Sequence, residues 1–290
     1  MTNHALTQTE FLAYGAESHY VGVLRLNRPE LHNAFGDLMI AELINALDEL
    51  AALPGLRVLL LESTGKNFSA GADLNWMRAM AQKDYQQNLT DAGALALLMA
   101  KLNSFPLPVI ALVQGAAFGG AVGLVACCDM AIATPKTSFC LSEVKIGLIP
   151  AVISPYVVRA IGERASRRYF TTAERFDAAT ALQLGLISEL AEGRLTGDAD
   201  QADLRAKAQP LIDAIIANSP QAVVAAKALV AYVADAPLSP DTIAETSRRI
   251  AAIRVSAEGQ EGLTAFLDKR TPAWQPAHKR RPITRKNPDV

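Results

Sequence analysis

The 290-residue chain has little cysteine, histidine or aromatic content: three cysteines, four histidines and 6% Phe, Trp and Tyr. Cys127, Cys128 and Cys140 lack CxxC spacing, so we expect neither a disulfide framework nor a metal site. None of the four histidines pairs with another histidine or with a cysteine at helical spacing. The sequence therefore predicts chemistry that does not depend on histidine.

The chain as a whole also lacks an excess of positive or negative charge. Lys and Arg number 28 against 29 Asp and Glu, which argues against nucleic acid as the main partner because a duplex-binding surface needs a strong cationic excess. Residues 269–290 differ, with seven basic residues, four prolines and little apolar content. We predict a basic, Pro-rich, disordered tail, with weak anion binding as the alternative.

The N-terminus lacks a basic segment followed by an apolar run, so the expected location is the cytoplasm. The one long apolar stretch, residues 109–128, contains Gln114 as its only strongly polar residue. Four glycines divide this stretch into a β-like half and a small-residue helical half. Two buried elements are therefore expected rather than a membrane span.

Apolar periodicity predicts alternating strands and helices up to about residue 195, which indicates an α/β core. We expect a loop over residues 62–77, and Asp37 as the cap of the first long helix. Strands are expected at 19–26, 57–61, 109–113, 130–134 and 138–141, and helices at 35–53, 85–104, 120–128, 155–161 and 178–184.

Beyond residue 195 the strand signal disappears, and three helices are expected at 204–218, 220–234 and 242–267. The predicted organisation is therefore an α/β core over 1–195, a helical region over 196–268 and the tail over 269–290.

The common phosphate-loop, dinucleotide, nucleophile-elbow and HExxH motifs are absent. Two glycine-containing loops, 69–73 and 115–120, each follow a predicted buried strand, and the second opens a helix. Approachable backbone N–H groups in such loops could form an oxyanion hole for a thioester oxygen that becomes enolate-like. Tight turns with a close helix–strand contact explain the same pattern equally well.

Glu143 lies in a largely apolar stretch, residues 139–150, where a carboxylate is costly without a role or a partner. Burial would raise its pKa and suit it to moving a proton at carbon. A salt bridge with Lys145 or a contact with the backbone is the structural alternative.

Together these segments resemble the enoyl-CoA hydratase/isomerase (crotonase) superfamily over about residues 15–274. The motifs are FSAGADL at 68–74, VQGAAFGGAVGLVACCDMAIA at 113–133, SEVKIGLIP at 142–150 and the A-x-x-x-G-L-I element at 181–187. The resemblance implies a crotonase-like spiral of β-β-α turns with a C-terminal helical trimerisation region. It also implies an acyl-CoA substrate, no separate cofactor, and a homotrimer or dimer of trimers.

By the same resemblance, the N–H groups of Ala72 and Gly120 would form the oxyanion hole, and Glu143 would exchange a proton with the substrate. Lys269 would reach the CoA phosphates, in its own site or in that of a neighbouring subunit, and an ordinary surface lysine is the equal alternative. The adenine and pantetheine path would be lined by Ala70, Gly71, Ala72, Asp73 and Leu74.

Two departures from the family pattern affect the expected reaction. Gly123 stands where ordinary hydratases carry a second glutamate, and residues 151–156 replace a glycine-rich run that walls the acyl pocket. Without that glutamate, Tyr156, Asn75 or the substrate's own acid could place the water. For a distal substrate carboxylate, Arg78 and Lys145 are merely nearby in sequence.

Residues 70–77 and 119–132, among other segments, resemble most the methylglutaconyl-CoA hydratase branch of the superfamily. We therefore expect hydration of a branched or carboxylated 2-enoyl-CoA, above all 3-methylglutaconyl-CoA of leucine catabolism. The alternatives are an isohexenylglutaconyl-CoA hydratase of acyclic terpene breakdown, a Δ3,Δ2-enoyl-CoA isomerase, and a non-catalytic CoA- or RNA-binding homologue.

Overall fold

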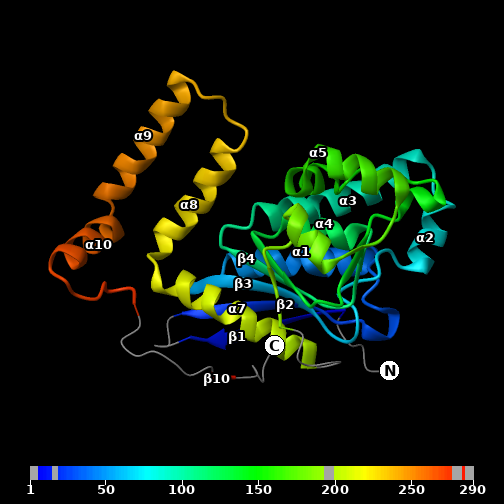
Figure 1. Ribbon diagram of the computed structural model, residues 1–290, viewed down its shortest axis with the longest axis horizontal. Helices are drawn as coiled ribbons and strands as arrows, with labels where there is room; N and C mark the ends of the chain where they lie inside the picture. The colour runs from blue at the N-terminus through cyan, green and yellow to red at the C-terminus, as the bar shows by residue number, and fades with distance from the viewer. Residues whose placement is uncertain (1–5, 15–18, 193–198, 276–282, 285–290) are drawn as a thin grey trace.

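The computed structural model describes residues 6–14, 19–192, 199–275 and 283–284, and it has the α/β architecture that the sequence predicts (Figure 1). The large sheet has the order β10-β1-β2-β3-β4-β6-β9. Strands β2, β3, β4, β6 and β9 run parallel, whereas β1 is antiparallel to both of its neighbours. The bounds are β1 Thr7–Ala13, β2 Tyr20–Leu26, β3 Leu56–Ser63, β4 Val109–Val113, β6 Met130–Ala133, β9 Glu189–Leu190 and β10 Ile283–Thr284.

The central strand β3 is buried along its whole length because helices cover both faces of the sheet. Alternate side chains of a strand point to opposite faces. Leu59 and Leu61 accordingly join the core built with α1, and Val58 and Leu60 join the core built with α7. This explains why the β3 sequence is a continuous apolar run rather than an alternating one.

A smaller sheet has the order β5-β7-β8, with β5 Ala116–Phe118, β7 Ser138–Cys140 and β8 Phe176–Asp177. Strands β5 and β7 are parallel, pairing Ala116 with Ser138 and Phe118 with Cys140. A parallel bridge between Ser69 and Ala117 adds the segment before Ala72 to the other side of β5.

Most helices pack on the large sheet, whereas the last three extend away from it (Figure 1). Helices α8, α9 and α10, here called the C-terminal arm, extend away from the sheet at the left of Figure 1. Beside the short 3-10 helices η1 Pro29–Leu31 and η2 Glu143–Ile146, the helices are α1 Asp37–Ala51, α2 Leu74–Met80, α3 Tyr85–Asn103, α4 Gly120–Cys127, α5 Ser154–Thr172, α6 Ala178–Leu184, α7 Ala199–Ala217, α8 Pro220–Val233, α9 Pro240–Val255 and α10 Ala257–Leu267.

Four sequence expectations are corrected by local capping and helix continuation. Part of the expected loop at 62–77 is helix α2, because Asp73 caps it. The cap of α1 is Gly36, and Asp37 accepts a bond only from Leu38 N. The helix expected at 242–267 is two helices, since Ser256 ends α9 and caps α10. The helix expected at 155–161 does end there, because Gly162 has non-helical φ 77° and ψ 160°, but a second helical segment continues α5 beyond this kink to residue 172.

The predicted disorder of the tail falls largely outside the described residues, at 276–282 and 285–290. Its first part packs on the helical region: Arg270 pairs with Glu261 at 2.7 Å, and Trp274 Nε1 donates to Ala217 O at 3.2 Å. Residues 283–284 form β10 beside β1, so the expectation of no strand beyond residue 195 is wrong there.

The apolar run at 109–128 forms β4, β5 and the short α4, not one helix. Within the described ranges, no single helix is long and apolar enough to cross a membrane. Residues 200–217 and 220–233 reach that length and apolar character only when taken together, and the two helices are bent by 108° relative to each other.

Candidate active site

The candidate residues come together because three neighbouring segments run parallel and end at the same edge. The segment before Ala72 bridges β5 through Ser69, and β5 pairs with β7. Ala72 follows the first segment, Gly120 follows β5, and Glu143 comes three residues after β7. The carboxyl ends of parallel strands meet at one edge, which is where open α/β sheets bind ligands. The structure thus unites residues that lie up to seventy positions apart.

Glu143 is the carboxylate of this edge. A Cβ placed on Gly119 would lie 3.3 Å from Glu143 Oε1, so the carboxylate lies against the backbone that precedes Gly120. Burial raises the pKa of Glu143, although a hydrogen bond from its own backbone acts in the opposite direction. The other alternative to a catalytic role, a backbone contact, is thus present, but Oε2 is buried with no hydrogen-bond partner among the described residues. A salt bridge to Lys145 is not among the ion pairs found in the described part of the chain. A half-buried carboxylate with one unpartnered oxygen and a raised pKa is suited to proton transfer.

The two N–H groups of the predicted oxyanion hole do not donate any hydrogen bond found between the described residues. Phe35 N donates to Gly71 O at 2.9 Å, and Asp73 N donates to Phe35 O at 3.0 Å. In this parallel bridge the residue between them, Ala72, keeps its own N–H free. Gly120 is the first residue of α4, where N–H groups have no partner inside the helix.

Phe35 also contacts the second donor. Its side chain is 2% exposed, and a Cβ on Gly120 would lie 2.6 Å from Phe35 Cζ. One residue therefore pairs by its backbone with the residues around Ala72 and packs by its ring on Gly120. The spacing of the two donors depends on this contact.

The buried Asn33 and the half-buried Asn67 fix the loop that leads to Ala72. Asn33 Nδ2 donates to Thr64 O and Asn67 O, each at 2.8 Å. Asn67 Oδ1 in turn accepts from Ala116 N at 2.9 Å, which ties this loop to β5. Gly115 must lack a side chain, because a Cβ there would meet Lys66 O at 2.1 Å.

The side chain of Asp73 is committed to structure. Its Oδ1 accepts from Asn75 N at 2.7 Å and Trp76 N at 3.1 Å, and its Oδ2 lies 2.9 Å from Arg28 Nη1. Burial alone would raise the pKa of Asp73, but the hydrogen bonds from Trp76 and Asn75 and the charge of Arg28 lower it below its ordinary value. Any contact of Asp73 with CoA would therefore come from its backbone.

Other members of the predicted CoA path differ in access. Ala70 and Leu74 are exposed, and Leu74 leaves 67% of its surface open. Gly71 is buried with φ +97°, and a Cβ there would lie 3.0 Å from Phe118 O. In the path predicted from the sequence, the residues at both ends are therefore exposed, and the turn at Gly71 between them is tightly packed.

Gly123, where a second glutamate was expected from the family pattern, is closed by packing. A Cβ at this position would lie 2.2 Å from Ile153 Cγ2 and 3.3 Å from Met99 Sδ. Ile153 is 2% exposed and occupies the space into which a side chain would project. The contact between α4 and the start of α5 therefore leaves no space for a carboxylate side chain at position 123.

The suggested substitutes for that glutamate have other neighbours. Tyr156 interacts electrostatically with Cys127, at the far end of α4 from Gly120. Asn75 Oδ1 accepts from Arg78 Nη1 at 2.7 Å. These contacts do not bring either side chain to Glu143.

Lys269 follows α10, which lies at the opposite end of the molecule from α2 and the loop before it (Figure 1). Within one chain the structure does not bring Lys269 to the site. Among the described residues, no cluster of His, Cys, Asp or Glu could hold a metal ion.

Sequence reasoning missed the residues that hold the loops: Phe35, Asn33, Asn67 and Gln114. Gln114 carried a usable signal, since it is the only strongly polar residue in a twenty-residue apolar run. Such a residue needs buried hydrogen-bond partners. The other three lie in polar or turn-rich segments where nothing distinguishes them.

Comparison with known proteins identifies the family. The chain matches the enoyl-CoA hydratase/isomerase family over residues 16–277. An enoyl-CoA hydratase structure from Shewanella pealeana is 52% identical, with a TM-score of 0.85 over 93% of this chain and 96% of that one. An enoyl-CoA hydratase/isomerase structure from Marinobacter aquaeolei is 28% identical, with a TM-score of 0.83 over 93% and 98%. The 2,3-dehydroadipyl-CoA hydratase of Escherichia coli K12 is 30% identical over 87% of this chain and 94% of its own length.

The fold and the comparisons thus define an α/β enzyme that acts on acyl-CoA thioesters. The chain belongs to the enoyl-CoA hydratase/isomerase (crotonase) family and is an enzyme of the enoyl-CoA hydratase type. The predicted fold class and superfamily are confirmed.

Proposed function

We propose that this enzyme hydrates a branched or carboxylated 2-enoyl-CoA, with 3-methylglutaconyl-CoA as the favoured substrate. The observation that carries the proposal is the position of Glu143, with its buried and unpartnered Oε2, against Gly119 and next to the free N–H of Gly120. A related hydratase is named for 2,3-dehydroadipyl-CoA, the thioester of a dicarboxylic acid, which supports a carboxylated acyl group.

A single carboxylate can complete the addition of water. With the thioester oxygen between the N–H groups of Ala72 and Gly120, the Glu143 carboxylate takes a proton from water as the water oxygen bonds to C3. The electron pair of the double bond moves into the thioester as an enolate, which the two N–H groups stabilise. Protonated Glu143 then returns the proton to C2, so water is added and Glu143 is restored.

We infer Δ3,Δ2-isomerisation as the second candidate because Ile153 closes the position of a second carboxylate at Gly123. In that reaction Glu143 would take a proton from C2 of a 3-enoyl-CoA and return it to C4. The reaction needs no water, so one acid–base group is sufficient.

The assembly we propose is a homotrimer or a dimer of trimers. The C-terminal arm exposes large apolar side chains, including Val255 at 79% and Phe266 at 81% exposure. Burial of such side chains would favour association. In that assembly, Lys269 of one subunit would contact the CoA phosphates bound by another.

The test is turnover of the purified protein with 3-methylglutaconyl-CoA and with crotonyl-CoA, following loss of the enoyl absorbance and identifying products by mass. Strong selectivity for the first substrate is expected. Inactivity on both, with a 3-enoyl-CoA converted to its 2-enoyl isomer, would replace hydration by isomerisation.

A third reading, a non-catalytic CoA- or RNA-binding protein, is tested by deleting residues 276–290. The enzyme we propose keeps its turnover after this deletion. Salt-sensitive RNA binding that disappears with the tail, in a protein inactive on both thioesters, would favour the binding role.

A further inference from the structure

The two loops of the oxyanion hole start from neighbouring points of the large sheet. The first loop leaves β3 after Ser63, and the second leaves β4 after Val113. The two strands are parallel neighbours, with Leu61 paired to Ala111. The distance between Ala72 and Gly120 therefore depends on how the chain is held just beyond these strand ends.

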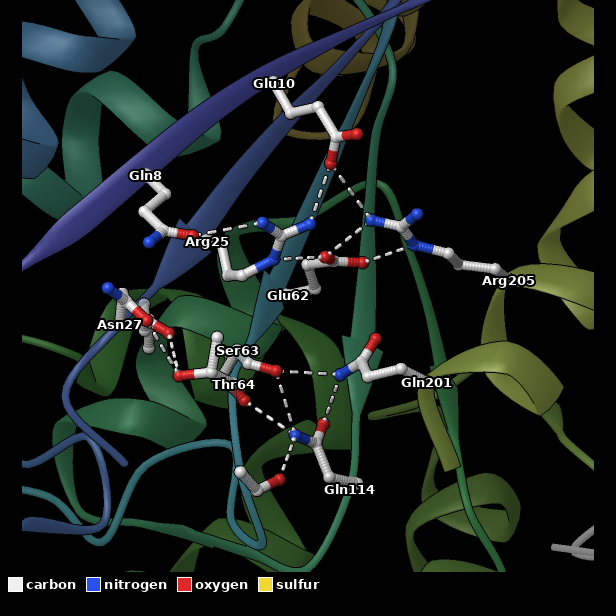
Figure 2. Close-up of polar contacts among 12 residues, drawn as sticks. Gln8, Glu10, Arg25, Asn27, Glu62, Ser63, Thr64, Gln114, Gln201 and Arg205 are labelled. Atoms are coloured by element: carbon white, nitrogen blue, oxygen red, sulfur yellow. Dashed lines mark hydrogen bonds and ion pairs between the residues drawn. The ribbon is translucent and has the colours of Figure 1, made fainter. Parts of the chain in front are cut away.

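Gln114 joins the two starting points. It is 1% exposed, and its Nε2 lies 2.9 Å from Ser63 Oγ, 3.1 Å from Ser63 O and 3.1 Å from Gly65 O. Figure 2 shows this amide directed from one strand end toward the other. A buried amide with these partners fixes two backbone segments relative to each other.

Gln201 of α7 completes the contact. Its Nε2 donates to Gln114 Oε1 at 3.0 Å and to Ser63 O at 2.9 Å (Figure 2). One turn further along α7, Arg205 binds Glu62 through two nitrogens, at 3.0 and 2.8 Å. Glu62 is 1% exposed and also accepts from Arg25 at 2.7 Å. Helix α7 is thereby held at the point where both loops begin.

The position of Gln114 is transmitted to the hole by backbone bonds. Phe68 N donates to Gln114 O at 2.7 Å, Ser69 N to Ala116 O at 3.0 Å, and Phe118 N to Ser69 O at 3.1 Å. These bonds set the register of the two loops up to the residues before Ala72 and Gly120. A shift at Gln114 therefore shifts the two donors relative to each other.

We propose that Gln114 and Gln201 are positioning residues that set the placement of the two N–H groups, so that α7 takes part in shaping the oxyanion hole. This inference rests on the proposed function, since it assumes that these N–H groups bind the thioester oxygen. Neither glutamine touches the reacting atoms, and both act through the backbone of the loops.

The test compares three identical substitutions. Gln114→Leu removes the amide contacts between the loops, and Gln201→Leu removes only the link to α7. Gln209→Leu is the matched control, because Gln209 is exposed two turns along α7 and bonds to Tyr14 and Asp213 instead. We expect kcat to fall about 10- to 100-fold for Gln114→Leu and about 3- to 10-fold for Gln201→Leu, since small misplacement of a catalytic group is costly. We expect KM to change less than about twofold, and Gln209→Leu to match the wild type.

A second readout separates positioning from folding and from the proposed reaction. Acetoacetyl-CoA is a β-keto thioester whose enolate absorbs light, and a formed oxyanion hole favours that enolate when the thioester binds. The enolate absorbance of bound acetoacetyl-CoA should fall in the order wild type, Gln201→Leu, Gln114→Leu, while the melting temperature of Gln201→Leu stays near that of the wild type.

The outcomes distinguish the two proposals. No enolate on the wild-type protein would overturn the oxyanion hole, and the inference with it. Enolate and turnover equal to wild type in folded Gln114→Leu and Gln201→Leu proteins would overturn the inference alone. If Gln114→Leu does not fold, Gln201→Leu decides, because Arg205 still holds α7 on Glu62 in that variant.

Discussion

At the residue scale, Glu143 combines the proposed acid–base role with a cost to the stability of the fold. Its pKa is raised because burial disfavours the charged form. The unfolded chain therefore releases this proton at lower pH than the folded protein, and stability falls as pH rises from the unfolded pKa through the folded one. The carboxylate thus opposes folding at neutral pH.

We predict that Glu143→Gln abolishes turnover, leaves CoA binding intact and raises the melting temperature at pH 8. Glutamine keeps the shape of the side chain but cannot move the proton. The gain should shrink as the pH falls and vanish below about pH 3, under the ordinary glutamate pKa, where Glu143 is protonated in both states. Scanning calorimetry at the two pH values measures this, and a gain independent of pH would contradict the electrostatic explanation.

Phe35 permits a second prediction. Gly120→Ala should lower turnover by about 100-fold, because the new Cβ collides with the Phe35 ring and displaces the donor. Phe35→Leu in the same chain removes the colliding Cζ and should restore part of the rate. Kinetics of the single and double variants test this.

The matched control is Phe68→Leu, since Phe68 is equally buried in the first loop but is not among the atoms close to Gly120. It should give no rescue of Gly120→Ala. Equal rescue by both leucines would show general loosening of the core instead of relief of one contact.

At the scale of elements, the packing of α4 on α5 decides what can stand at Gly123. We predict that Gly123→Ala destabilises the protein by about 1–3 kcal/mol, because it overpacks a filled interface. In an Ile153→Ala background the same change should cost less, since the Cγ2 methyl group at 2.2 Å is gone, although the Cβ of residue 153 at 2.7 Å remains. Urea unfolding of the four proteins gives the coupling energy, and simple additivity would contradict the contact.

The junction between α7 and α8 explains how the C-terminal arm is attached. Buried Arg57 of β3 donates to Asn218 O at 2.7 Å, and Lys227 of α8 pairs with Asp129 at 2.6 Å. Burial lowers the pKa of Arg57, although the charge of Glu258 acts in the opposite direction. The arm is therefore fixed at its base by polar contacts, while its far end remains exposed.

At the scale of the whole molecule, α10 and the Ala72 loop lie at opposite ends, so Lys269 can serve the site only in trans (Figure 1). We predict that Lys269→Ala raises KM about tenfold with little change in kcat, because one charge-assisted bond to a phosphate is lost. Co-expression with the inactive Glu143→Gln chain should restore sites of normal KM in mixed oligomers.

Recovery of a normal KM distinguishes action of Lys269 in a neighbouring subunit from action in its own chain. In trans, an intact Glu143 from the Lys269→Ala chain meets an intact Lys269 from its neighbour. If Lys269 acted within its own chain, no site in the mixture would contain both residues, and KM would stay raised. A monomer by light scattering would also contradict the assembly.

The sequence by itself determined the α/β core, because buried parallel strands and amphipathic helices each leave a periodic apolar pattern that needs no partner to be read. It also marked Glu143, since a carboxylate in an apolar stretch is anomalous locally. The motifs around Ala72 and Gly120 identified the family for the same local reason.

Only the tertiary structure decided which of these residues contact one another and which side chains have no space at a given position. The contacts of Ile153 with Gly123, of Phe35 with Gly120 and of Gln201 with Gln114 join residues 30, 85 and 87 positions apart. The strand β10 and the split of residues 242–267 into two helices were likewise missed, because pairing and capping overrule weak local preference. Side-chain contact across such separations leaves no periodic trace in one sequence, so packing and register had to be seen.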